Sequence, residues 1–270
     1  MPLVSVGGRK VYCEVHGEER PGTPLVLVMG LGGSCNGWLP LQVPEFAAAR
    51  RTVIYDHRGV GESEDPGGAF STADLADDLA GLLDALEIEQ ADVLGVFMGG
   101  MVAQELALRH PDRVARLVLV GTWARPDAKR RMLLEQWRDL ARADNTIQVI
   151  VRERLLWTLQ DETLEQHDLI DSMIEFFEKD GAPFTNDLFA RQCEACLAHD
   201  TADRLRGIPH RTLVLCGRRD ALTPPPFHRE LADEIPDAHL ATMGYGGHIV
   251  MVESAPHFNR AVLQFLDEGR

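Results

Sequence analysis

The chain has 270 residues, of which 45% are hydrophobic, and its formal net charge is −15. This length and hydrophobic content suffice for one large α/β domain with an insertion, and they exclude a disordered chain. The negative charge disfavours nucleic acid and anionic membranes as partners, because both attract clustered Lys and Arg. We therefore expect a small, largely uncharged molecule as the binding partner.

The N-terminal segment lacks a basic start followed by a long apolar stretch, and no segment approaches the roughly 20 apolar residues of a membrane span. Five cysteines, an odd number, indicate a reducing compartment. We therefore expect a cytoplasmic protein. Cys193 and Cys196 form a lone C-x-x-C pair, which we interpret as two buried thiols rather than a metal site. Cys35 is left open between a packing role and that of a substitute nucleophile.

The first half of the chain predicts alternating strands and helices. Residues 1–17 alternate around Gly7-Gly8, which indicates a hairpin. The apolar runs at 23–30, 51–59, 91–96 and 114–124 are typical of buried parallel strands. Between Thr72 and Ile88, leucines at helical spacing predict an amphipathic helix, with Asp74, Asp77, Asp78 and Asp84 facing water. A further helix is expected from about Gly99.

Residues 126–206 differ from the rest because they offer helical patterns only. The alternation resumes with a strand at 210–220, a helix near 227–233, a short strand at 239–243 and a last helix at 256–266. We therefore predict a core domain made of residues 1–125 and 207–270, interrupted by a helical cap over 126–206.

The segment Gly95-Val96-Phe97-Met98-Gly99 lies between a predicted strand and a predicted helix. That context is typical of the nucleophile elbow, G-x-S-x-G, with Phe97 where the nucleophile is expected. A phenyl ring cannot attack a carbonyl. The apex of such a turn normally has a positive φ, which is strained for a bulky residue. We expect the ring to project into a cavity over the sheet and to form an apolar wall.

Three further sequence features lie at the ends of other predicted strands. Residues 29–34 (MGLGGS) follow a strand and supply backbone N–H groups that could face an oxyanion. Asp220 closes a strand, and His248 lies in a loop before the last helix. The order elbow, acid, histidine matches the α/β-hydrolase fold, which the chain resembles over nearly its whole length. The resemblance implies a mainly parallel, eight-stranded sheet covered by helices, with a helical lid.

Within that fold, the chain most resembles small esterases and lactonases, including oxoadipate enol-lactonases, and their cofactor-free relatives. The likeness is carried by LADDLAGLLDALEI, GGMVAQELALRHPDRVARLVLVGT and RRDALTPP. It implies His248 as general base and Asp220 as its orienting partner. It also implies the backbone N–H groups of Leu31 and Met98 as the oxyanion hole, and no cofactor or metal. Met29 departs from the pattern where a histidine is common, and Phe97 removes the covalent serine mechanism.

The other residues around the predicted site have structural interpretations. We expect Asp56 and Arg58 to pair or cap near a strand end, and we assign no catalytic role to His57 or His110. The predicted substrate pocket is lined by Phe97, Trp123, Trp157 and Ile249. Arginines 130, 131, 138, 152, 154 and 191 of the insertion are expected on a solvated helix face, with carboxylate binding as the alternative.

Three functions remain open from the sequence. The first is an enzyme that uses His248 and Asp220 on a small, mostly apolar carbonyl compound (an ester, lactone or enolisable ketone), without a covalent serine intermediate. The second is an inactive, Ser-to-Phe altered form of a serine esterase or lactonase. The third is a non-catalytic ligand-binding protein. A homodimer is left open as the assembly.

Overall fold

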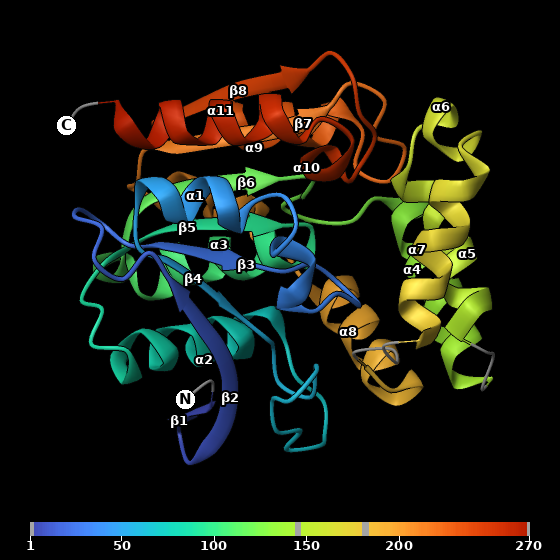
Figure 1. Ribbon diagram of the computed structural model, residues 1–270, viewed down its shortest axis with the longest axis horizontal. Helices are drawn as coiled ribbons and strands as arrows, with labels where there is room; N and C mark the ends of the chain where they lie inside the picture. Colours follow the sequence, from blue (N-terminus) through green and yellow to red (C-terminus); the bar gives the residue numbers. More distant parts are fainter. Residues whose placement is uncertain (1–2, 144–146, 180–183, 269–270) are drawn as a thin grey trace.

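The centre of the molecule is an eight-stranded sheet (Figure 1). The computed structural model describes residues 3–143, 147–179 and 184–268. The strands are β1 (Leu3–Val6), β2 (Arg9–His16), β3 (Leu25–Val28), β4 (Thr52–Tyr55), β5 (Ala91–Val96), β6 (Val114–Val120), β7 (Thr212–Gly217) and β8 (Ala238–Met243). They lie in the order β1-β2-β4-β3-β5-β6-β7-β8. The β1–β2 and β2–β4 pairings are antiparallel and the others parallel, which confirms the predicted sheet.

Alternate residues of the central strands enter two separate cores. Val26 and Val28 of β3 belong to a core with helices α2, α3 and α9. Leu25 and Leu27 belong to a core with helices α1 and α11. The split follows from the twofold side-chain period of a strand. These helices are α1 (Val43–Ala49), α2 (Thr72–Ala85), α3 (Met98–Arg109), α9 (Pro225–Glu234) and α11 (Ala255–Asp267). Because both faces are covered, the central strands are apolar along their whole length.

The segment between β6 and β7 contributes helices that lie beyond the carboxyl ends of the parallel strands (Figure 1). These are α4 (Ala128–Arg142), α5 (Ile147–Thr158), α6 (Asp161–Leu164), α7 (His167–Lys179) and α8 (Asn186–Ala198). In its described residues, this segment contains no strand, as the sequence predicts. Part of it has its own apolar core, made of Val151, Leu155, Leu159 and Ile174. We call α4 to α8 the helical insertion.

Short elements complete the chain. They are the 3₁₀ turns Cys35–Trp38, Pro111–Arg113 and Ala202–Gly207, and the helix α10 (Val250–Glu253). The helices predicted at 227–233 and 256–266 correspond to α9 and α11. The predicted ends lie within about two residues of the observed ends, which is the usual uncertainty for helix ends. Among the helices that the structure describes, none combines the length and the apolar character that a membrane span requires.

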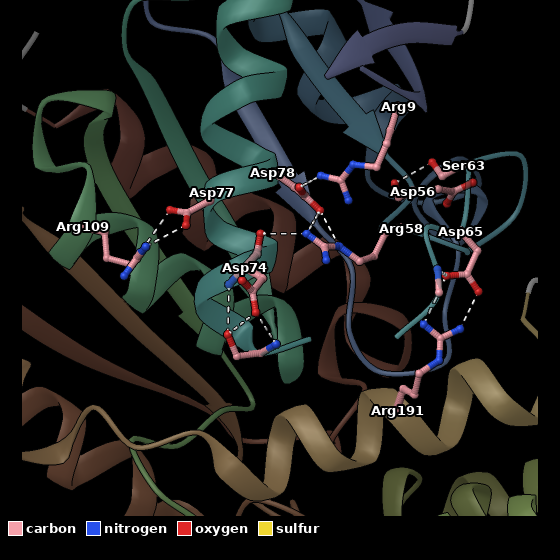
Figure 2. A network of polar contacts seen from close by, with 12 residues as sticks. Arg9, Asp56, Arg58, Ser63, Asp65, Asp74, Asp77, Asp78, Arg109 and Arg191 are labelled. Carbon is pink, nitrogen blue, oxygen red and sulfur yellow. Dashed lines mark hydrogen bonds and ion pairs between the residues drawn. The ribbon is translucent and has the colours of Figure 1, made fainter. Parts of the chain in front are cut away.

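Asp77 and Asp78 of α2 are engaged in ion pairs (Figure 2). Asp78 binds Arg9 and, at 2.6 Å, Arg58, and its side chain is only 14% exposed. Asp77 pairs with Arg109 at 2.7 Å. The expectation that these aspartates face water is therefore wrong for Asp78. Helical spacing identifies the apolar face of a helix, but it does not say which distant cations dock on the opposite face.

Candidate active site

The turn between β5 and α3 has the geometry of a nucleophile elbow. Phe97 lies at its apex with φ 47°, as the motif predicts. A Cβ on Gly95 would stand 2.2 Å from the carbonyl oxygen of Gly99, and a Cβ on Gly99 would stand 2.2 Å from that of Val28. Both positions thus require glycine, because the helix start approaches the sheet at backbone contact distance. The Phe97 carbonyl accepts a hydrogen bond from Thr122 Oγ1 at 2.8 Å, which further fixes the turn.

The ring of Phe97 is buried between two other rings. Its centroid lies 5.0 Å from that of Trp123 and 5.2 Å from that of the His248 imidazole, and both pairs are nearly perpendicular. Edge-to-face contacts at such distances are favourable. The side chain that replaces the nucleophile is therefore packed directly against the predicted base.

His248 and Asp220 form a close pair although 28 residues separate them. The imidazole Nδ1 lies 3.0 Å from Asp220 Oδ2. The carboxylate also accepts hydrogen bonds from the N–H and the Oγ1 of Thr223, at 2.7 and 2.6 Å. Burial by itself would raise the pKa of Asp220, but His248 and these hydrogen bonds hold that pKa below its usual value. The carboxylate is thus ionised and keeps the Nδ1 proton on the imidazole.

A cavity of about 90 Å³ lies beside this pair. It is lined by Met29, Gly30, Leu31, Gly33, Val96, Phe97, Trp137, Arg154, Thr158, Leu222, His248, Ile249 and Met251. Since Nδ1 faces Asp220 and no described residue binds Nε2, the second nitrogen of His248 is available to a molecule in the cavity. The arrangement is that of a general base beside a mostly apolar cavity.

Two of the four predicted pocket residues, Phe97 and Ile249, line this cavity. Trp123 does not, because it lies fully buried between Phe97 and Phe227. Trp157 is also outside the lining, and the Lys129 ammonium lies 4.9 Å from its ring. The structure thus brings Phe97 and Ile249 together at this cavity and places Trp123 and Trp157 outside its lining. Trp123 packs behind Phe97, and it is the Phe97 ring that forms the surface of the cavity.

The predicted oxyanion donors lie on two segments that meet at the cavity. Leu31 belongs to the loop after β3 and lines the cavity. Met98 is the first residue of α3, so its N–H has no partner within the helix; Met98 itself is not among the lining residues, but the adjacent Phe97 is. The Met29 carbonyl accepts a hydrogen bond from His57 Nε2 at 3.0 Å.

The residues given structural interpretations from the sequence have such roles. Asp56 Oδ1 accepts a hydrogen bond from the backbone N–H of Cys35 at 2.7 Å, and burial raises the pKa of Asp56 to about 6. His57 is buried, which lowers its pKa to about 4. His110 pairs with Asp77 on the surface at 2.7 Å. None of Asp56, His57 and His110 lines the cavity.

The cysteines offer no alternative nucleophile. Cys35 is fully buried, lies outside the cavity lining and has its pKa raised, first by burial and then by Asp56. Cys193 and Cys196 are buried in the main core with raised pKa values, also because of burial. Within the described ranges, no three His, Cys, Asp or Glu side chains gather as a metal site would require. The site is thus built without a thiolate.

The arginines of the insertion differ from one another in environment. Arg191 of α8 binds Asp65 in the loop before α2, at 2.5 Å (Figure 2). Arg130 donates to the carbonyls of Leu222 and Ala221, at 2.7 and 2.8 Å. Arg154 is mostly buried at the cavity. The expectation of a solvated face is therefore wrong for all three.

The insertion also binds the histidine loop directly, a contact that the sequence gave no reason to expect. The Thr158 carbonyl accepts hydrogen bonds from the N–H groups of His248 and Ile249, at 2.9 and 3.2 Å. Glu253 binds the Gly247 N–H at 2.5 Å and Thr163 Oγ1 at 2.5 Å. The loop that carries the base is therefore held from both sides.

Comparison with known proteins gives matches over nearly the whole chain. Residues 23–255 match the family described as the alpha/beta hydrolase fold. A protein of Serratia proteamaculans (strain 568), named provisionally as a carbamate hydrolase, is 35% identical over 95% of this chain and 96% of its own length. The 2-hydroxymuconate semialdehyde hydrolase of Pseudomonas sp. (strain CF600) is 35% identical, over 93% of this chain and 89% of its own.

A solved structure shares the architecture as well. The enol-lactonase from Burkholderia xenovorans LB400 superimposes with a TM-score of 0.90 at 29% sequence identity, over 99% of this chain and all of the other. The resemblance inferred from three sequence segments is therefore confirmed at the level of the fold.

Proposed function

The chain belongs to the α/β-hydrolase fold family, and from this premise we propose that it transforms a small, mostly apolar carbonyl compound through His248 and Asp220, without a covalent serine intermediate. One observation carries the proposal: His248 Nδ1 lies 3.0 Å from Asp220 while the same imidazole borders the cavity. An ester, a lactone or an enolisable ketone is the expected substrate class.

For an ester or lactone, the proposed reaction uses water as the nucleophile. His248 Nε2 takes a proton from a water molecule as its oxygen attacks the carbonyl carbon. The N–H groups of Leu31 and Met98 stabilise the negative oxygen of the tetrahedral intermediate. The intermediate then collapses, the C–O bond breaks, and the imidazolium returns its proton to the leaving oxygen. Asp220 stabilises the imidazolium throughout.

For an enolisable ketone, the same groups support proton transfer without hydrolysis. His248 takes a proton from the carbon beside the carbonyl, and the two N–H groups stabilise the enolate oxygen. Reprotonation at carbon by the imidazolium completes the exchange. The two reactions share a base and an oxyanion hole, and they differ only in whether water is bound.

Phe97 limits the size of the substrate in this proposal. Its ring stands where an acyl-enzyme would form and leaves a cavity of about 90 Å³. The ring fills part of the space beside His248, so the substrate must fit the cavity that remains, whose lining is mainly apolar. A small carbonyl group beside one water molecule fits that space.

The named relatives support the choice of substrates to test. They are named for a carbamate, a semialdehyde and an enol-lactone, which all carry a carbonyl or acyl group. A panel of short esters, small lactones, carbamates and enolisable ketones covers these chemistries. Consumption by the native protein is followed by chromatography, and solvent deuterium uptake reports enolisation.

The deciding experiment pairs His248→Ala with Phe97→Ser on this panel. We expect the native protein to transform at least one compound and His248→Ala to lower kcat/KM by about 10⁴-fold, the upper range of acid–base catalysis. His239→Ala, which removes an exposed imidazole on β8, is the matched control and leaves the rate unchanged. A serine-directed phosphonate probe is expected to label Phe97→Ser and to leave the native protein unlabelled.

Three results would count against the proposal. Ester cleavage that appears only in Phe97→Ser identifies an altered, inactive serine esterase. Ligand binding without turnover in either protein, unaffected by His248→Ala, identifies a binding protein. Phosphonate labelling of the native chain would mean that another residue acts as nucleophile.

A further inference from the structure

Arg154 of α5 is a mostly buried cation whose hydrogen bonds go to backbone oxygens. Its guanidinium donates to the Leu31 carbonyl at 2.7 Å and to the Gly32 carbonyl at 3.2 Å. In the part of the chain that the structure describes, no carboxylate pairs with it. Burial lowers the pKa of Arg154 to about 10, so the group stays charged at neutral pH. A buried cation without an acidic partner is costly, and its position therefore calls for a function.

A second side chain of the insertion binds the same loop. Gln192 of α8 is fully buried and accepts a hydrogen bond on Oε1 from the Gly32 N–H at 2.8 Å. The Leu31 carbonyl and the Gly32 N–H belong to one peptide plane. Arg154 thus holds the oxygen of this plane while Gln192 holds its N–H. With both polar atoms bound, the plane cannot rotate without breaking two hydrogen bonds.

The loop is shaped to receive the arginine. Gly32 has φ 63°, and a Cβ there would stand 2.7 Å from Arg154 Nη1 and 2.8 Å from the Phe189 ring. The guanidinium carbon lies 5.5 Å from the centroid of the same ring. Glycine is therefore required both for the backbone conformation and for the space that the arginine fills.

The held plane directly follows the one that carries the Leu31 N–H. Rotation about the backbone of Leu31 would redirect that N–H relative to the cavity, so fixing the next plane also fixes the donor. One turn farther along α5, the Thr158 carbonyl binds the N–H groups of His248 and Ile249. Thr158 Oγ1 also donates to the Arg154 carbonyl at 3.0 Å. One helix thus contacts both the oxyanion loop and the histidine loop.

We propose that Arg154 is a positioning residue, which together with Gln192 aims the Leu31 N–H at the oxyanion and makes the helical insertion part of the reacting site. The inference rests on the proposed function, because it assigns the oxyanion donor of that reaction. Arg154 acts through the loop and is not required to touch the substrate.

The test compares Arg154→Met, which keeps the length and removes the donors, with Arg154→Lys and Gln192→Leu. Arg152→Met is the matched control, since Arg152 lies on the same helix and is exposed. With an uncharged substrate, we expect Arg154→Met to lower kcat by about 10²-fold with little change in KM. The reason is that misplaced oxyanion donors weaken the binding of the transition state and leave the binding of the substrate unchanged. Arg154→Lys restores part of the rate, and Gln192→Leu reproduces part of the loss.

Amide hydrogen exchange of a peptide spanning residues 29–36 gives a readout that needs no turnover. Exchange is expected to be faster in Arg154→Met and in Gln192→Leu, and unchanged in Arg152→Met. Circular dichroism confirms that each variant is folded. If native protein has no activity but exchange responds as expected, the proposed function fails while the loop assignment stands.

Two results would overturn the inference. Equal exchange and equal kcat in Arg154→Met and Arg152→Met would show that the arginine does not fix the loop. A loss limited to the KM of substrates that bear a carboxylate, with uncharged substrates unaffected, would make Arg154 an anion-binding contact instead.

Discussion

The elbow and the dyad meet at the cavity and retain different parts of a catalytic site. At the elbow the backbone is complete, with φ 47° at Phe97, but the side chain has no reactive atom. At the dyad the reactive groups themselves are in place, 3.0 Å apart. The elbow conformation persists because the packing of Gly95 and Gly99 imposes it, independently of the residue at the apex. Backbone strain therefore identifies the place of a nucleophile without showing that one is present.

Asp220→Asn tests the dyad side and has the largest expected effect. In Asp220→Asn the amide oxygen would accept from the Thr223 N–H and the NH2 group would face His248 Nδ1. The imidazole would then adopt the wrong tautomer, and its cation would no longer be stabilised. We expect kcat/KM to fall by about 10⁴-fold. Asp203→Asn, at a side chain that is 93% exposed, is the control. Activity retained in Asp220→Asn would remove the dyad from the mechanism.

Gly99→Ala tests the elbow side through stability. The added Cβ would stand 2.2 Å from the Val28 oxygen and 2.7 Å from that of Met29, so strand and helix must separate. We expect the free energy of unfolding in urea to fall by about 3 kcal/mol, the upper range for overpacking. Gly244→Ala, where a Cβ meets no atom within 4 Å, should be neutral. Equal stability of the two variants would show that the elbow packing does not impose its conformation.

Acid sensitivity has the smallest expected effect and depends on two buried imidazoles, those of His57 and His228. Burial lowers the pKa of His57, on the oxyanion side, and of His228, behind Asp220, to about 4. The unfolded chain takes up these protons near pH 6.5 and the folded chain resists them until about pH 4. Stability is therefore complete above pH 6.5 and falls below it, by about 1.4 kcal/mol per pH unit for each histidine.

Urea unfolding at pH 7.5 and 5.5 measures this loss, and His57→Gln should reduce it by about 1.4 kcal/mol. The comparison with the variant is needed because Asp56, whose pKa is raised to about 6, increases the stability of the folded protein as the pH falls, whereas the histidines decrease it. The same loss in both proteins would place the acid sensitivity elsewhere.

The sequence predicted the framework of the site because that framework depends on local patterns. Apolar runs that end in glycine located the strands, and the glycines around Phe97 located the elbow with its positive φ. The pairing of His248 with Asp220 came from the family resemblance, since neither residue carries a local signal. The geometry then brought the two residues together.

The contacts missed by the sequence all join distant segments. Arg154 lies 123 positions from Leu31 along the chain, and Gln192 lies 160 from Gly32. The sequence pattern placed Arg154 on a solvated helix face, because a helical pattern does not include the loop that folds against the helix.

Because none of the five native cysteines is reactive, a cysteine introduced at the elbow could be modified selectively. All five thiols are buried and have raised pKa values, so the described chain presents no competing thiolate. A Phe97→Cys substitution would place a single reactive sulfur beside His248, at the point where a strained backbone presents it to the cavity. Alkylating reagents of graded length could then measure how large a group the cavity beside His248 admits.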